Sequence, residues 1–231
     1  MQTLCKITRQ LKAHWNRLAL IFCCGSGLAL AQSAGDAESL RRFKLLPPDQ
    51  LSPAQKKLAD SIRSGPRAAV PGSAANQAAL GSPFNVFLRS PEVGEHLQQV
   101  GSYIRFKSTL GFKLNEFAIL ITARHWGAQY EWFAHHRLAL QAGLDPKIAE
   151  EVAQNRRPQG MSPEEQAIYD FSIELHRDKK VSDASFQAVL DRFGEQGVMD
   201  LIAVNGYYTL IAMVLNVDRT PLPGGAPLPL K

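Results

Sequence analysis

The chain is poor in cysteine, and its three cysteines, Cys5, Cys23 and Cys24, lie within the first 24 of 231 residues. From residue 25 onward no thiol is present to form a disulfide, to ligate a metal or to attack a peroxide. A form of the protein that loses the first residues therefore has no thiol chemistry, and its stability has to come from packing.

The chain also lacks a basic face. Its 26 lysines and arginines exceed its 21 acidic residues, but four of the basic residues and none of the acidic ones precede residue 32. The remaining chain carries a net charge of +1. Because no cluster of lysine and arginine follows Lys44, we expect no nucleic-acid partner.

The first 31 residues have the composition of a secretion signal. The basic residues Lys6, Arg9, Lys12 and Arg17 precede an apolar run over residues 18–31, which ends in the small-residue triplet 29–31. We expect cleavage after Ala31. The run is shorter than the roughly 20 residues that span a bilayer. The sequence therefore predicts a periplasmic or secreted protein with no membrane partner after cleavage.

No segment alternates apolar and polar residues for long enough to require a strand, and no tight hairpin turn joins two strand-like runs. The predicted fold class is all-α. Helix-start signals occur at Ser52-Pro53, Ser90-Pro91, Asp145-Pro146, Ser162-Pro163 and Ser182. They predict helices over residues 53–64 and 91–110 and further helices that begin after 145, 162 and 182. Residues 114–142 are helical in composition, with a kink or division at Trp126-Gly127, and residues 195–216 form a buried core helix.

Four segments follow from this pattern. Residues 1–31 are the signal peptide, and residues 32–82 are an N-terminal extension with one short helix and an arm rich in proline, glycine and alanine over 66–81. Residues 83–220 form the helical domain. Residues 221–231 are a proline- and glycine-rich tail that we expect to be extended. The apolar helix and the tail suit either a subunit interface or packing within the chain.

Ionisable residues inside the apolar segment 116–140 mark the candidate site, because burial of such groups is costly unless they are paired or used. Helical periodicity places Arg124, Glu131 and His135 on one face, and a continuous helix adds Glu116 to it. Glu131 precedes His135 by one turn and can orient its imidazole, as in a general base or proton relay. An i, i+4 pair of this kind is equally an ordinary helix-surface pair, so both interpretations stay open.

Two further features of the segment bear on its chemistry. Adjacent histidines such as His135 and His136 point about 100° apart on a helix, so we expect no metal site. Tyr207 and Tyr208 follow Gly206, which permits close helix approach, and they are either pocket residues or a packed aromatic pair.

Four segments carry a resemblance to a known family: residues 114–120, residues 128–135, residues 139–143 and the triplet 206–208. Over roughly residues 83–223 the chain resembles the carboxymuconolactone decarboxylase family, which also contains the alkylhydroperoxidase D branch. The resemblance implies an all-α alkylhydroperoxidase D-like helical bundle assembled into a homo-oligomer, and it implies no cofactor.

In the peroxidase branch of that family, a glutamate is followed by Cys-x-x-Cys and then by a histidine. These positions correspond to Glu116, Ala128, Glu131 and His135, so both thiols are missing and peroxidase activity is not implied. The decarboxylase branch releases CO₂ from a carboxylated muconolactone. By resemblance, Glu116, Glu131 and His135 handle the proton, while Arg124 and Tyr130 bind the substrate.

The family's decarboxylase acts in an intracellular pathway, whereas this chain is predicted to be exported. Three alternatives therefore remain open at the level of sequence. The protein decarboxylates another small carboxylated lactone or keto acid, it binds a small molecule without turnover, or it is an assembly protein with a vestigial pocket.

Overall fold

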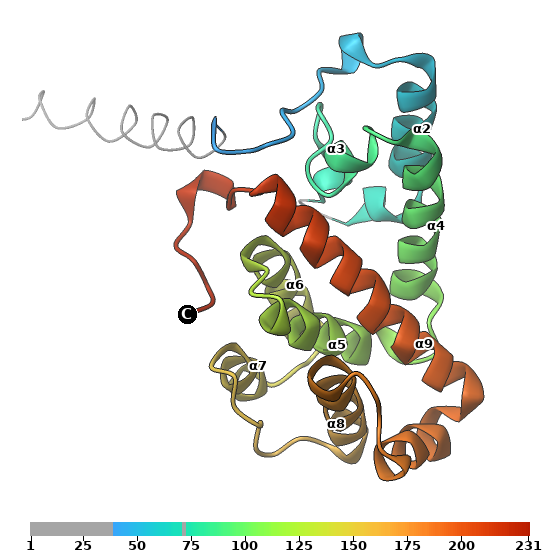
Figure 1. The fold of residues 1–231 in the computed structure, drawn as a ribbon, viewed down its shortest axis with the longest axis vertical. Coiled ribbons are helices and arrows are strands. Elements are labelled where there is room, and N and C mark those ends of the chain that lie inside the picture. Colours follow the sequence, from blue (N-terminus) through green and yellow to red (C-terminus); the bar gives the residue numbers. More distant parts are fainter. Residues whose placement is uncertain (1–38, 71–72) are drawn as a thin grey trace, which may run out of the picture.

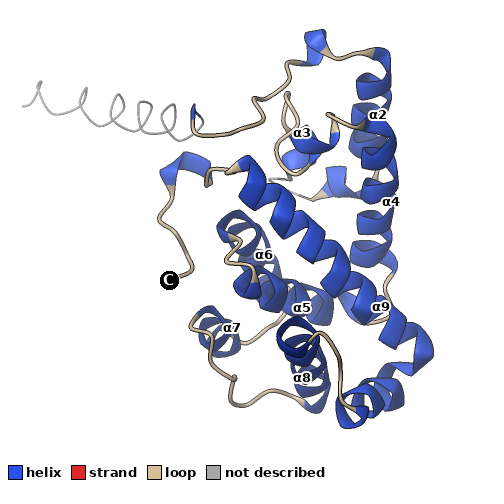
Figure 2. Ribbon diagram, in the orientation of Figure 1, coloured by secondary structure: helices blue, strands red, loops and turns tan. Residues whose placement is uncertain are grey.

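The computed structural model describes residues 39–70 and 73–231. The predicted signal peptide lies outside these residues. The described part of the chain contains eight α-helices and no strand, which confirms the all-α prediction (Figure 2).

The helix starts follow the capping residues of the sequence. Helix α2 (Pro53–Ser64) begins with a capping box between Ser52 and Gln55, and α8 (Pro163–Asp178) begins with a second one between Ser162 and Glu165. In both, the serine side chain accepts a hydrogen bond from the backbone three residues on, and that residue's side chain accepts one in return. Helix α7 (Pro146–Ala153) is capped by Asp145.

Helix α4 (Pro91–Lys107) begins as predicted but ends three residues before the predicted residue 110. The chain turns there because Asp200 accepts hydrogen bonds from the backbone amide and the hydroxyl of Thr109, at 2.8 and 2.9 Å. Gly111 then adopts φ +76°, a left-handed conformation that glycine reaches without strain. A tertiary contact thus sets the end of α4.

The predicted division at Trp126-Gly127 separates α5 (Gly111–His125) from α6 (Gln129–Gln141). Gly127 has φ +56°, so it ends α5 in the way that a left-handed residue commonly ends a helix. Helix α5 is the centre of the bundle and packs against α6, α7, α8 and α9 (Figure 1). The ten residues from 114 to 123 are all buried.

Helix α9 (Asp183–Asp218) contains the predicted core helix 195–216 and the helix that begins after Ser182. Gly194, with φ +65° and ψ −178°, breaks the helix between the two parts. In the described chain, α9 alone is long and apolar enough to cross a membrane by length and composition, and half of its most apolar window is buried inside the protein. A core helix passes the same test.

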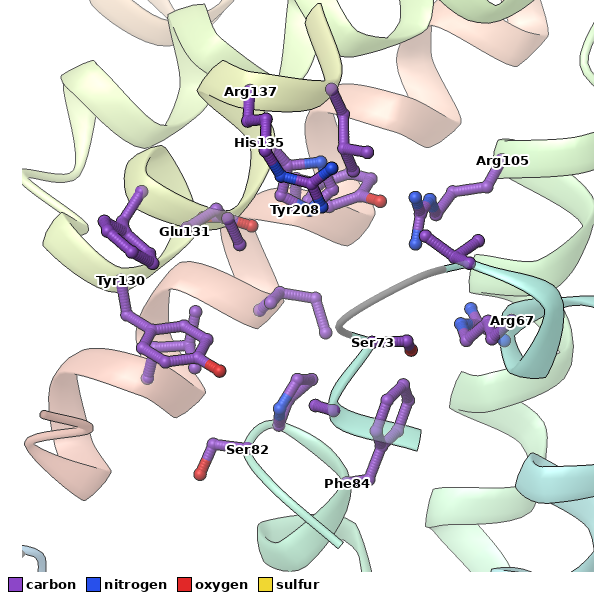
Figure 3. Close-up of a pocket in the computed structure, with 18 of the residues that line it drawn as sticks. Arg67, Ser73, Ser82, Phe84, Arg105, Tyr130, Glu131, His135, Arg137 and Tyr208 are labelled. Atoms are coloured by element: carbon purple, nitrogen blue, oxygen red, sulfur yellow. The ribbon is translucent and has the colours of Figure 1, made fainter. Parts of the chain in front are cut away.

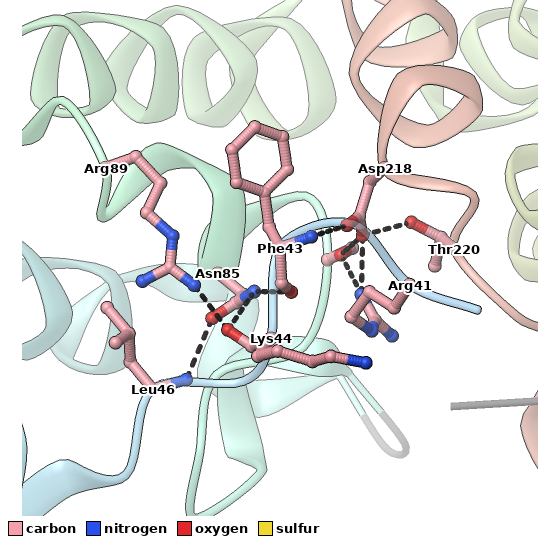
Figure 4. A network of polar contacts seen from close by, with 9 residues as sticks. Arg41, Phe43, Lys44, Leu46, Asn85, Arg89, Asp218 and Thr220 are labelled. Atoms are coloured by element: carbon pink, nitrogen blue, oxygen red, sulfur yellow. Dashed lines mark hydrogen bonds and ion pairs between the residues drawn. The ribbon is translucent and has the colours of Figure 1, made fainter. Parts of the chain in front are cut away.

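The N-terminal segment is fastened to the end of α9 by a buried cluster of polar groups (Figure 4). The Arg41 guanidinium donates to Asp218 at 2.6 Å, and Ser82 and the Phe43 amide donate to the same carboxylate at 2.8 and 3.0 Å. Asn85 continues the attachment by donating to the Phe43 carbonyl at 2.9 Å. Asn85 lies in α3 (Phe84–Phe87), a short helix that the sequence did not predict.

The arm over residues 66–81 carries two 3₁₀ turns, η2 (Pro66–Ala69) and η3 (Ala74–Asn76). A further turn, η1 (Pro48–Gln50), precedes α2. The expectation of a tail without helix was wrong by one turn, because η4 (Pro223–Gly225) forms with Gly224 at φ +64°. The tail ends against α6, where Gln129 and the backbone of Leu230 exchange two hydrogen bonds of 2.9 Å.

A second buried polar group joins α5, α8 and α9 away from the site described below. The Thr122 hydroxyl lies 3.0 Å from Nε2 of His176 and 3.3 Å from Oδ1 of Asn205, whose amide donates to Ser172 at 3.1 Å. His125 stacks on His176 at 4.8 Å between ring centroids. Burial, together with the nearby His125, lowers the pKa of His176 from 6.5 to about 4.

This pKa predicts a loss of stability in acid. Between pH 6.5 and about 4, His176 binds a proton in the unfolded chain but stays neutral in the native state. The free energy of unfolding therefore falls as the pH falls through this window. We expect a loss of about 1–3 kcal/mol by pH 4 relative to pH 7. Denaturant unfolding of His176→Gln should show a shallower pH dependence than the wild type.

The matched control is His96→Gln, which changes an exposed histidine. It should leave the pH dependence of the unfolding free energy at its wild-type value. Equal slopes for wild type and His176→Gln would contradict the burial of a neutral imidazole at this position.

Candidate active site

The cavity of the described chain that carries the predicted residues has a volume of about 600 Å³. It lies between α6, the second half of α9, the end of α4 and the arm over residues 66–81 (Figure 3). A volume of this size suits a small molecule. The polar groups on its wall are chiefly Arg67, Arg105, Tyr130, Glu131, His135 and Tyr207.

The catalytic candidates Glu116 and His135 meet across the α5–α6 interface. Glu116 is fully buried on α5, and its Oε2 lies 2.7 Å from Nδ1 of His135 on α6. A carboxylate at this distance holds the imidazole in one orientation. Nε2 is then the ring nitrogen available to a ligand in the cavity.

The expected contact between Glu131 and His135 does not form, because Glu116 takes the Nδ1 position instead. Glu116 was expected to share the face of His135 if the helix were continuous. The break at Gly127 instead makes α5 and α6 separate neighbours, so that residues 19 apart in the chain face one another.

Glu131 is the least compensated group in the cavity wall. It is 1% exposed, and neither carboxylate oxygen has a hydrogen-bond partner. Burial therefore raises its pKa well above 4.5. Burial thus favours the neutral, protonated form of this carboxyl group, which can donate a proton.

The two tyrosines of α9 complete this part of the wall. The ring of Tyr208 packs edge-on against the His135 imidazole, with centroids 5.1 Å apart. Burial raises the pKa of Tyr208 well above 10 and that of Tyr207 to about 12, so both hydroxyls keep their protons. Both tyrosines line the cavity, as one of the two sequence interpretations required.

Of the two predicted substrate-binding residues, Tyr130 lines the cavity and Arg124 does not. Arg124 lies in the last turn of α5 and donates to the backbone carbonyl of Lys231 at 3.0 Å. Gly127, in a left-handed conformation, divides α5 from α6. Arg124 and His135 therefore belong to different helices, and helical periodicity does not place them on one face.

Sequence reasoning missed Arg67 and Arg105, which lie on the cavity wall opposite the α6 residues (Figure 3). Arg67 comes from the arm that was predicted as a loop, and Arg105 comes from the last turn of α4. The one local signal was Gly101, a small residue in mid-helix one turn before Arg105 that makes room for neighbouring side chains.

Two observations bear on whether the site could hold a redox-active thiol or a metal ion. Ala128, which the family resemblance matches to the first cysteine of the peroxidase branch, is fully buried before the first turn of α6. Within residues 39–70 and 73–231, no group of three or more histidine, cysteine, aspartate or glutamate side chains is placed to hold a metal ion.

The protonated state of Glu131 predicts how Glu131→Gln behaves. The native pKa exceeds the unfolded value, so the wild type has its full stability below about pH 4.5 and loses stability as the pH rises towards the native pKa. The glutamine variant cannot ionise. As the pH rises above about 4.5, its unfolding free energy should therefore rise relative to wild type, by up to about 1.4 kcal/mol per pH unit.

Infrared spectroscopy checks the same claim directly. At pH 7 the wild type should show the carbonyl band of a protonated carboxylic acid, and Glu131→Gln should lack it. The control is Glu164→Gln, a fully exposed carboxylate whose pKa is lowered by hydrogen bonds from its own backbone amide and from Ser162. A difference spectrum in which Glu131→Gln and Glu164→Gln look alike would overturn the assignment.

Comparison with known proteins supports the fold. No protein-family model and no curated protein matches the sequence. Among solved structures, the chain is similar to a protein from Agrobacterium tumefaciens of unknown function, proposed by its description to be the antioxidant-defence protein AhpD. The two share 14% sequence identity and a TM-score of 0.54 over 60% of this chain and 96% of that one. The helical bundle of this protein therefore has the alkylhydroperoxidase D-like fold.

Proposed function

We propose that this protein is an exported relative of the carboxymuconolactone decarboxylases that removes CO₂ from a small carboxylated lactone or keto acid, without a cofactor, by proton transfer. The observation that carries the proposal is the neutral, unpartnered Glu131 on the same cavity wall as the Glu116–His135 pair. Such a pairing of a poised acid with an oriented imidazole is typical of proton-transfer sites.

The step balances with the residues present. The bond between carbon and the carboxylate breaks, CO₂ leaves, and the electron pair moves into the adjacent carbonyl to give an enolate. Glu131 then supplies the proton that the carbon takes up, which leaves the Glu131 carboxylate to be reprotonated from solvent. His135, held in one orientation by Glu116, donates a hydrogen bond from Nε2 to the enolate oxygen.

The surroundings of the cavity favour this division of roles. The wall also includes Leu138 of α6 and Ile211 and Leu215 of α9, and electrostatic interactions beside apolar side chains are stronger than in bulk solvent. In the transition state for loss of CO₂, the charge of the carboxylate spreads over more atoms. An apolar wall therefore destabilises the transition state less than it destabilises the bound carboxylate.

A binding protein without turnover is the alternative, and the same cavity volume supports it. The two functions differ in what the site residues control. In a catalyst, loss of His135 lowers the rate and leaves affinity nearly unchanged, whereas in a binder the same change lowers affinity alone. Peroxidase chemistry finds no support, because Ala128 and Glu131 stand at the thiol positions.

Export and assembly belong to the same proposal. The pattern of residues 6–31 supports export to a periplasm or the exterior. An exposed apolar stripe along α9, formed by Met199, Ile202, Met213 and Val217, supports a homo-oligomer. These residues lie on one helix face, and exposed large apolar side chains gathered on one face are typical of an interface.

The catalytic proposal predicts that the purified protein releases CO₂ from members of a panel of carboxylated γ-lactones and β-keto acids. His135→Ala and Glu116→Gln should lower the rate by about 10²–10⁴-fold, since each removes part of the proton-handling pair. Binding of the same substrate, measured by calorimetry, should change far less than the rate.

The control variant is His136→Ala. His136 is the next residue of α6, but its ring stacks on Trp132 and it does not line the cavity. Its rate should stay near the wild-type value. Turnover that persists in His135→Ala, or that falls equally in His136→Ala, would contradict the assigned roles.

The assembly proposal predicts a mass above that of the monomer in sedimentation equilibrium. The double variant Met199→Glu, Ile202→Lys should dissociate the oligomer, because it places charges in the apolar stripe. Gln187→Lys, an exposed change in the first part of α9, should leave the mass unchanged. A wild type that is monomeric at micromolar concentration would refute the assembly.

A further inference from the structure

We infer that Arg67 and Arg105 form an anion subsite that binds a carboxylate of the ligand, and that the N-terminal extension thereby contributes to specificity. The inference of an anion site rests on the two arginines in the cavity wall. The identification of the anion as the substrate carboxylate rests on the proposed function. No sequence motif assigns either arginine to the site.

Arg67 is a buried cation that lacks an acidic partner. It is 4% exposed, and one guanidinium nitrogen donates to the backbone carbonyl of Gln98 at 3.0 Å. Its guanidinium lies over the Phe84 ring at 5.5 Å, and within the described chain it forms no ion pair. Burial lowers the pKa of Arg67, which shows how little solvent compensates its charge.

Arg105 is equally under-compensated. Its side chain is 11% exposed, and its contact with a carboxylate is a long one, 3.7 Å to Oε1 of Glu116. Nε and Nη2 have no hydrogen-bond partner. The other oxygen of Glu116 is already occupied by His135, so this one carboxylate serves two partners.

The charge of the cavity wall is therefore unbalanced. Two under-compensated arginines, Arg67 and Arg105, line it, and Glu131 is the one acidic residue among the described residues of the lining. Burial raises the pKa of Glu131 and so favours its neutral form. A wall of this composition attracts an anion, and a planar guanidinium matches the geometry of a carboxylate.

The backbone of α4 is shaped to admit this arrangement. A Cβ at Gly101 would lie 2.2 Å from the Tyr207 hydroxyl and 2.6 Å from Nη2 of Arg67. Glycine at this position thus lets a hydroxyl donor and a guanidinium reach the same point on the cavity wall. Tyr207 keeps its proton, so it adds a neutral hydrogen-bond donor to the two cations.

The subsite also explains why the extension packs as it does. The arm that carries Arg67 is one wall of the cavity, through Val70, Ser73, Ala74 and Gln77 as well. The charge of the neighbouring Arg105 lowers the pKa of Arg67 further, in addition to the effect of burial. Two like charges held together in a buried wall cost free energy, which a bound carboxylate would recover.

Benzoate and its neutral isostere benzamide test the subsite without any knowledge of the substrate. Benzoate should raise the thermal unfolding midpoint and bind in calorimetry, and benzamide should bind about tenfold more weakly or worse. In Arg67→Gln and Arg105→Gln the benzoate affinity should fall at least about tenfold, to the level of benzamide. Arg192→Gln, an exposed arginine on α9, has the same charge change and should keep wild-type affinity.

Equal binding of benzoate and benzamide to the wild type would overturn the inference even if Arg67→Gln fails to fold. Retained benzoate affinity in a folded Arg105→Gln would overturn it as well. Preference for inorganic phosphate over benzoate would overturn the carboxylate assignment. Benzoate binding without CO₂ release from any member of the substrate panel would support the subsite and refute the proposed function. CO₂ release without benzoate binding would support the proposed function and refute the subsite.

Discussion

The site depends on the burial of one carboxylate. Glu116 lies in the middle of α5, which packs against α4 as well as α6, α7, α8 and α9, and it is fully buried. An ionised carboxylate in such a place requires partners, and removal of one partner from a buried pair costs about 3–5 kcal/mol. His135 and Arg105 supply them at 2.7 and 3.7 Å. Contact with the buried carboxylate of Glu116 thus orients the His135 imidazole and places Arg105, in the last turn of α4, beside the cavity.

A second consequence of this arrangement is the division of charge in the cavity. Because Glu116 engages His135 and Arg105, Glu131 is left without a partner and burial raises its pKa. The cavity wall consequently contains an oriented imidazole, a neutral acid and two under-compensated guanidiniums, from α6, α4 and the arm. These are groups for moving a proton and for holding an anion, which is the combination that decarboxylation of a small acid needs.

The parts of the fold that follow from local chemistry were predictable. The caps at Ser52 and Ser162 and the left-handed Gly127 depend on neighbouring residues alone, and the structure has them where the sequence placed them. The end of α4 was predicted wrongly because Asp200, 91 residues away, sets it. The site shows the same contrast. Glu131 and His135 were found by spacing within one helix, whereas Arg67 and Arg105 reach the cavity through tertiary packing, for which Gly101 is the one local signal. Arg124 was placed by extending helical periodicity across a break that ends it.

Turnover of a carboxylated lactone or keto acid in D₂O, with the product analysed by NMR, tests the central claim most directly. If Glu131 delivers the proton from one wall of the cavity, the carbon that loses CO₂ should carry one deuterium, on a single face, and Glu131→Gln should abolish this product. Deuterium distributed over both faces, or a product formed equally by Glu131→Gln, would mean that the proton comes from bulk water and would contradict the account.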